Sequence, residues 1–112
     1  MPRVDREKLV VTARLWIRPG QRRAFDVFEG QAFEIMRRHK VRILQILSRE
    51  GDDKEAPHEV HVLKFPSNEA FEAYRNDPDL LALADLRADC IAETQIEITR
   101  SKTERFSSFP VL

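Results

Sequence analysis

Three histidines are the residues of this chain best suited to proton chemistry, because imidazole titrates near neutral pH. His58 and His61 share one β-branched segment, and their spacing places them on opposite faces of a strand, so they do not form a metal-binding pair. His39 ends a helical segment, where it favours the negative end of the helix dipole, and His58 is expected to be exposed at a strand start. His61, in mid-strand, is the first candidate for a catalytic acid–base residue; a hydrogen-bonded interface histidine is the alternative.

Three further side chains are candidates for ligand binding beside His61. Trp16 offers a wall for an aromatic ring, Arg14 a cation for a developing oxyanion, and Tyr74 a hydroxyl over a pocket. Two of them have a structural alternative, since Arg14 can pair with Glu97 across two strands and Tyr74 can pack in the core. The sequence has no metal motif, phosphate loop, nucleophile elbow or dinucleotide fingerprint, so we expect no metal and no cofactor.

Length and composition are those of one globular domain, residues 1–112, with a core at about 9–100 and a tail at 101–112. Lys and Arg total 19, as do Asp and Glu, and this balance argues against a nucleic-acid partner. A single cysteine, Cys90, excludes an internal disulfide and is expected to be buried and inert. Without a long apolar run or an apolar leader, we expect no membrane association and a cytoplasmic protein.

Four strands and two helical regions are expected to position the candidate residues. Period-two patterns predict strands at 9–17, 41–49, 58–65 and 93–100. Helical periodicity covers 21–40, with an apolar stripe of Phe25, Phe28, Ala32, Ile35 and Met36, and then 68–76 and about 79–91. Pro78 separates the last two because it removes a backbone donor. The order β-α-β-β-α-β predicts an α+β, ferredoxin-like sandwich with a four-stranded antiparallel sheet.

The two faces of this sheet have different expected partners. We expect the helices to cover the face that carries Val11, Val60, Val62, Ile96 and Ile98. The opposite face then carries Arg14, Trp16, His61, Leu63, Phe65, Gln95 and Glu97. A half-apolar sheet face is unfavourable in water, so the sequence predicts a homodimer in which two sheets pair face to face.

A set of short motifs after the third strand resembles a known family. The motifs are Phe65-Pro66-Ser67, Glu69-Ala70, Tyr74, Asp77-Pro78, Leu83 and Leu86-Arg87. They resemble the domain of unknown function 1330 family and, more broadly, the dimeric α/β-barrel superfamily, which includes the antibiotic-biosynthesis monooxygenases. The resemblance covers about residues 9–100 and implies a dimeric α/β barrel. Relatives usually carry glycine where the first helix ends, whereas this chain has Arg38-His39-Lys40.

Two functions remain open at this point. The first is a small-molecule-binding or non-catalytic dimeric module, with a small apolar or aromatic ligand. The alternative is a cofactor-independent monooxygenase or isomerase acting on a small aromatic or quinone-like molecule, since superfamily relatives take a proton from an activated substrate in a pocket within each protomer. An apolar pocket holding His61 or Tyr74 would favour the enzyme, and a sheet face filled by a partner would favour the module.

Overall fold

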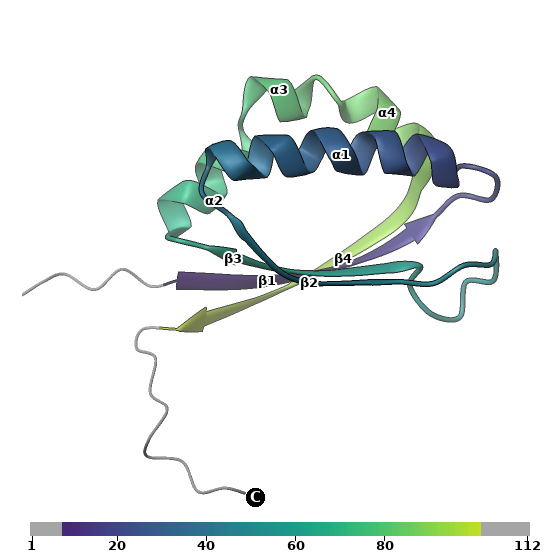
Figure 1. Cartoon of the computed structure of the whole chain (residues 1–112), viewed down its shortest axis with the longest axis horizontal. Coiled ribbons are helices and arrows are strands. Elements are labelled where there is room, and N and C mark those ends of the chain that lie inside the picture. Colours follow the sequence, from purple (N-terminus) through teal and green to yellow (C-terminus); the bar gives the residue numbers. More distant parts are fainter. Residues whose placement is uncertain (1–7, 102–112) are drawn as a thin grey trace, which may run out of the picture.

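The computed structural model describes residues 8–101 as a single antiparallel sheet with all helices on one of its faces (Figure 1). The strands are β1 (Lys8–Ile17), β2 (Arg42–Ser48), β3 (Glu59–Phe65) and β4 (Ile91–Ser101). The helices are α1 (Arg22–Arg38), α2 (Asn68–Arg75), α3 (Pro78–Leu81) and α4 (Ala84–Cys90). Among these residues, no helix combines the length and hydropathy that crossing a membrane requires.

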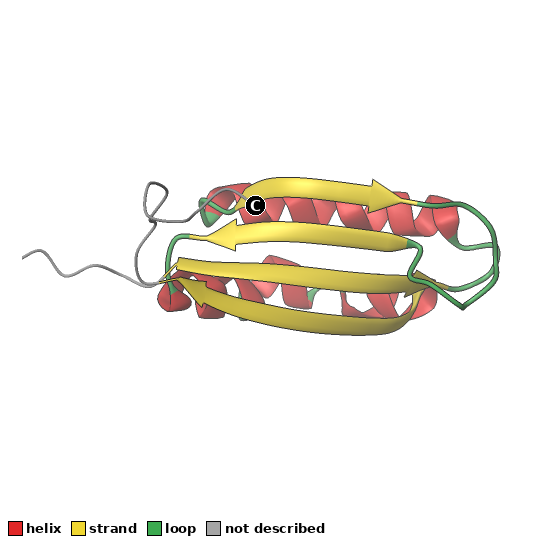
Figure 2. Cartoon of the chain, turned by 90° about the horizontal axis from the view of Figure 1, so that it is seen from below, coloured by secondary structure: helices red, strands yellow, loops and turns green. Residues whose placement is uncertain are grey.

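The strands lie in the order β2-β3-β1-β4, so the first and last strands of the chain are neighbours in the sheet. This confirms the predicted fold class and antiparallel sheet. Seen from below, the second face of the sheet has no helix over it (Figure 2). The apolar stripe of α1 is confirmed, because Phe25, Phe28, Ala32, Ile35 and Met36 are its buried residues.

The predicted break at Pro78 is also confirmed. Asp77 caps α3, its carboxylate accepting a hydrogen bond from the Asp79 N–H at 2.9 Å, and Pro78 takes the first helical position, where its missing donor costs nothing. The region after Pro78 is not one helix as predicted. A tight turn, in which the Leu83 N–H bonds to the Leu80 carbonyl at 3.0 Å, separates α3 from α4.

The end of α1 is closed by a residue with a side chain, where helices often end on a glycine. Lys40 takes the left-handed conformation, with φ 61°. Its N–H bonds to the Arg37 carbonyl, and the Val41 N–H bonds to the Met36 carbonyl, which is the hydrogen-bond pattern of a Schellman cap. Met36 and Val41 belong to one apolar cluster, as this cap favours. A residue with a Cβ is strained here.

Replacing Lys40 with glycine should therefore stabilise the protein by up to about 1 kcal/mol, because glycine adopts this φ without a Cβ clash. Urea unfolding measures the change. Lys40→Ala is the matched control, since it removes the same side chain but keeps the Cβ, and it should give no gain. Equal stabilities of the two variants would contradict this interpretation of the cap.

The strand register corrects the predicted faces of the sheet. Val11 pairs with Leu63 on one side and Ile98 on the other, so these three side chains share a face. The helices cover this face, on which His61 and Phe65 are also buried, and Val60 and Val62 lie on the other. The expectation was correct for β1 and β4 and wrong for β3. Both faces of β3 are rich in apolar residues, so its own pattern does not distinguish them.

Candidate functional site

A cavity of about 610 Å³ lies between the helix-covered face of the sheet and the helices. Apolar side chains from β1, α1, β3, α2, α3 and β4 form most of its wall. The polar and charged side chains that line it are Glu29, His61, Tyr74, Arg75, Arg87 and Thr94. Leu81, Ile96 and Ile98 also line it while remaining partly exposed, so the cavity opens between β4 and α3.

His61 contacts two carboxylates at one side of this cavity. Its Nε2 lies 2.8 Å from Glu59 Oε1 and 3.0 Å from Glu29 Oε2. Phe25 and Phe33 pack against the imidazole ring, with centroids 6.4 and 5.5 Å away. His61 and Glu59 are buried, whereas the Glu29 side chain keeps 23% of its surface exposed and lines the cavity. Glu29 is thus the carboxylate that a ligand can reach.

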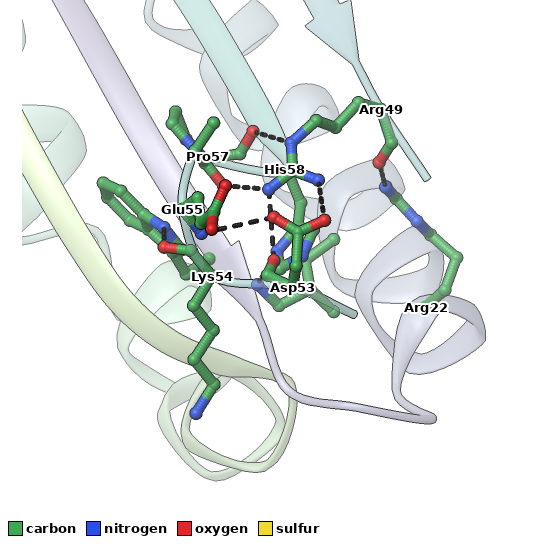
Figure 3. A network of polar contacts seen from close by, with 10 residues as sticks. Arg22, Arg49, Asp53, Lys54, Glu55, Pro57 and His58 are labelled. Carbon is green, nitrogen blue, oxygen red and sulfur yellow. Dashed lines mark hydrogen bonds and ion pairs between the residues drawn. The ribbon is translucent and has the colours of Figure 1, made fainter. Parts of the chain in front are cut away.

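Arg22 holds Glu59 from the far side of the cluster. Its guanidinium donates to Glu59 Oε2 at 2.6 Å and to the Arg49 carbonyl at 2.8 Å. Arg49 in turn spans the loop before β3, donating to the Pro57 carbonyl at 3.1 Å and to Asp53 at 3.0 Å (Figure 3). This chain of contacts fixes Glu59, and Glu59 orients the His61 ring.

The cluster keeps His61 protonated at neutral pH. Burial lowers the pKa of His61, but attraction to Glu29 and Glu59 outweighs burial and raises the pKa to about 9. Burial likewise raises the pKa of Glu59, and hydrogen bonds from His61, Ser48 and Arg22 outweigh it and lower the pKa to about 2. Burial alone would have kept His61 neutral, and the two carboxylates reverse that effect.

The unequal contacts of Glu29 and Glu59 indicate where a ligand would bind. The Nε2–H of His61 is directed at Glu59. No N–H or O–H among residues 8–101 makes a hydrogen bond of good geometry to Glu29 Oε2. The Glu29 side chain also keeps 23% of its surface exposed and lines the cavity, so a hydroxyl or acidic C–H of a bound molecule can approach this carboxylate rather than that of Glu59.

Glu29, Glu59 and His61 also bring three possible metal-ligand atoms within 4.8 Å of one another. Two features of these three residues make metal binding unfavourable. Arg22 already occupies one oxygen of Glu59, and Nε2 must lose a proton that both carboxylates hold in place before it can bind a metal. We therefore interpret the cluster as a proton-sharing site.

Tyr74 and Arg87 lie elsewhere on the cavity wall. Burial raises the pKa of Tyr74 to about 12, an effect that the nearby charge of Arg87 reduces, so its hydroxyl is a donor at neutral pH. Arg87 donates to Thr94 Oγ1 at 2.7 Å.

The structure separates Arg14 and Trp16 from His61. Both lie on the sheet face without helices, because Arg14 pairs across the strands with Val60 and Gln95, whereas His61 pairs with Ala13. The alternative for Arg14 is confirmed, since its guanidinium lies 3.1 Å from Glu97. Trp16 donates its indole N–H to the Lys54 carbonyl at 3.2 Å. Neither side chain lines the cavity.

The other residues considered for chemistry have structural contacts. His39 lies at the end of α1, where its Nε2 is 2.7 Å from Asp77 Oδ2. His58 is buried rather than exposed as predicted, because its Nδ1 accepts a hydrogen bond from the Ile17 N–H at 2.9 Å. Cys90 is fully buried as expected, and burial raises the pKa of its thiol.

The two carboxylates of the cluster, Glu29 and Glu59, were not among the residues predicted from the sequence. The signal for Glu59 was its spacing of two from His61, which places both on one strand face. The signal for Glu29 was its position on the apolar side of α1, four residues from both Phe25 and Phe33.

Comparison with known proteins identifies the fold. No protein-family model matches the chain, and no curated protein matches it. Solved structures do. A protein of unknown function from Rhodopseudomonas palustris has a TM-score of 0.69 at 14% identity, over 88% of this chain and 83% of that one. A dabb family protein with a ferredoxin-like fold from Mesorhizobium loti has a TM-score of 0.60 at 14% identity, over 84% and 96%. The fold is ferredoxin-like.

A further similar structure is described as an assembly. It is a dimeric ferredoxin-like protein of unknown function from Thermobifida fusca, with a TM-score of 0.65 at 11% identity, over 88% of this chain and 95% of that one. A NIPSNAP family protein of unknown function from Agrobacterium tumefaciens has a TM-score of 0.63 at 20% identity, over 95% and 96%. Identities this low bear on the fold alone.

Proposed function

We propose that this protein binds a small, largely apolar molecule in the cavity between its sheet and helices. The observation that carries the proposal is a cavity of about 610 Å³ with apolar walls and one buried charged cluster. Ligand sites in proteins commonly have this size, with a few polar groups that fix the orientation of the ligand. The ferredoxin-like fold also supports ligand binding in this cavity. The resemblance to the dimeric α/β-barrel superfamily, which has this fold, implies a pocket within each protomer.

The Glu29–His61 pair favours acid–base chemistry as the second candidate function. Glu29, whose partly exposed side chain lines the cavity, would accept a proton from an acidic C–H or O–H of the bound molecule. Protonated His61 would offset the negative charge left on the molecule. Return of the proton to a different atom of the same molecule completes an isomerisation, which needs no oxidant. We propose this reaction class in preference to a monooxygenase.

Binding can be tested with the neutral fluorescent probe N-phenyl-1-naphthylamine, whose emission rises in apolar surroundings. Ala84→Phe should weaken probe binding at least about tenfold, because Ala84 lines the cavity and is exposed enough to accept a larger side chain. Ala82→Phe is the matched control, since Ala82 does not line the cavity, and it should bind as the wild type does. No probe binding by the wild type, or equal binding by both variants, would contradict the proposal.

We also propose that the sheet face without helices pairs with a second copy of the chain. Leu63 and Phe65, on which this expectation first rested, lie on the other face, and Val60, Val62 and Leu47 now carry it together with Trp16. Leu47 is 53% exposed. Covering such a face in a stable dimer needs a total interface of more than ~1,000 Å².

Val62→Lys should convert the dimer to a monomer, because it places a charge at the centre of the apolar face. Val27→Lys should remain dimeric, since Val27 is an exposed valine of α1 on the helix side. Analytical ultracentrifugation at micromolar concentration distinguishes these states. A monomeric wild type would contradict the proposed dimer.

Two further expectations accompany this function. The equal numbers of acidic and basic residues support a protein without a nucleic-acid partner. The buried, unpaired Cys90 is compatible with the reducing environment of the cytoplasm, where we place the protein.

A further inference from the structure

We propose that the molecule bound in the cavity carries a carboxylate or another oxyanion, which Arg87 and Tyr74 recognise. This inference rests on the proposed function, because it names the class of ligand for the same cavity. The cavity then has two polar ends: the Glu29–His61 pair exchanges a proton, and the Arg87–Tyr74 pair binds a negative charge.

The charges that line the cavity balance except at Arg87. Within the cluster, Glu29 and Glu59 face His61 and Arg22, so two negative charges meet two positive ones. Arg75, the second arginine of the wall, pairs with Glu72 at 3.2 Å.

Arg87 differs from Arg75 in having no such partner. In the part of the chain that the structure describes, no carboxylate lies within ion-pair distance of its guanidinium. The contact of Arg87 with Thr94 involves a neutral hydroxyl and uses only one of its five N–H groups. Arg87 is itself exposed, so the cavity wall carries at its solvent-accessible side one positive charge without a carboxylate partner.

Tyr74 adds a second donor beside Arg87. Its side chain is largely buried, it lines the cavity, and no acceptor among residues 8–101 bonds its hydroxyl. The two residues are near enough for the charge of Arg87 to act on the Tyr74 hydroxyl. Asp77, the acidic residue that also acts on Tyr74, is itself paired with His39 at 2.7 Å.

A guanidinium and a phenol together suit an anionic oxygen, because hydrogen bonds from a cation to an oxyanion are about twice as strong as neutral ones. The rest of the wall is apolar, so the body of the ligand must be apolar as well. An aromatic or alicyclic acid has both properties. The same pair would also stabilise an enolate oxygen formed when Glu29 removes a proton.

The test compares 1-naphthoate with 1-naphthamide, which share a ring system and differ in charge. Displacement of N-phenyl-1-naphthylamine measures both affinities. The wild type should bind 1-naphthoate about tenfold more tightly than the amide. Arg87→Gln should remove this preference while leaving amide binding unchanged, and Tyr74→Phe should reduce it. Arg23→Gln is the control, because Arg23 is an exposed arginine of α1 that does not line the cavity.

Each other result has a definite meaning. Equal binding of the two probes by the wild type overturns the inference and leaves the proposed cavity function intact. Equal weakening of both probes by Arg87→Gln also overturns it, because a structural role would act on both. If Arg87→Gln does not fold, Arg87→Lys replaces it. Arg87→Lys should keep part of the preference for 1-naphthoate over 1-naphthamide. If Tyr74→Phe and Arg87→Lys both show the full wild-type preference, the inference is overturned. Failure of the wild type to bind either probe contradicts the proposed function itself.

Discussion

The free energy of unfolding of the wild type should fall by roughly 3 kcal/mol as the pH rises from 6.5 to 9, and His61→Gln should not show this loss. The pKa of His61 is about 9 in the folded protein and 6.5 in the reference state. Below pH 6.5 both states carry the proton, so the full stabilisation is present. Between pH 6.5 and 9 only the folded protein keeps the His61 proton. The stabilisation from this proton disappears as the pH approaches 9, because the folded protein then loses it too.

Urea unfolding at pH 6, 7.5 and 9.5 measures this difference. His39→Gln is the control, because it removes another histidine near a carboxylate and leaves the His61 cluster intact. It should still lose stability as the pH rises to 9.5, because the contacts of His61 with Glu29 and Glu59 are unchanged. Parallel pH profiles for the wild type and His61→Gln would mean that the two carboxylates do not hold the proton on His61.

Glu59→Gln should cost about 3 kcal/mol or more, and Glu29→Gln should cost clearly less, although both carboxylates contact the same nitrogen. Glu59 is 2% exposed and interacts with His61 and Arg22, so its removal leaves two cations without their shared partner. Glu29 is more exposed, and its Oε2 lacks a well-shaped hydrogen bond already.

Both variants are compared with the wild type at pH 6, where His61 is charged, by urea unfolding. Histidine NMR titration of the same samples should show a lower His61 pKa in Glu59→Gln than in the wild type. Equal costs for the two substitutions would contradict the distinction between a carboxylate that orients His61 and one that faces the ligand.

The fold could be predicted largely from local patterns. The stripe on α1 and the helix break at Pro78 each depend on residues close together in the chain, and both are confirmed. The faces of β3 could not be predicted this way, because Val60 and Val62 alternate with Leu63 and Phe65, and both sets are apolar. Only pairing with β1, a contact between distant segments, decides which set faces the helices.

The site was less predictable than the fold for the same reason. His61 was selected as the mid-strand histidine, but its protonation depends on Glu29 from α1, a residue 32 positions earlier in the chain. Arg14 and Trp16 were grouped with His61 because the face of β3 was assigned incorrectly. Tyr74 does line the same cavity as His61, and its role there remains a prediction.

Proton transfer in the cavity can be measured directly without knowing the natural ligand. 2-Tetralone is small and apolar, and its acidic C–H exchanges with deuterium in D₂O, which NMR follows over time. We expect the wild type to accelerate this exchange at least about 100-fold over buffer, as general base catalysis allows. Glu29→Gln should remove the acceleration, and Glu34→Gln, at an exposed glutamate of α1, should keep it. No acceleration by the wild type, or equal acceleration by Glu29→Gln, would contradict the proposed role of Glu29 as the proton acceptor of the cavity.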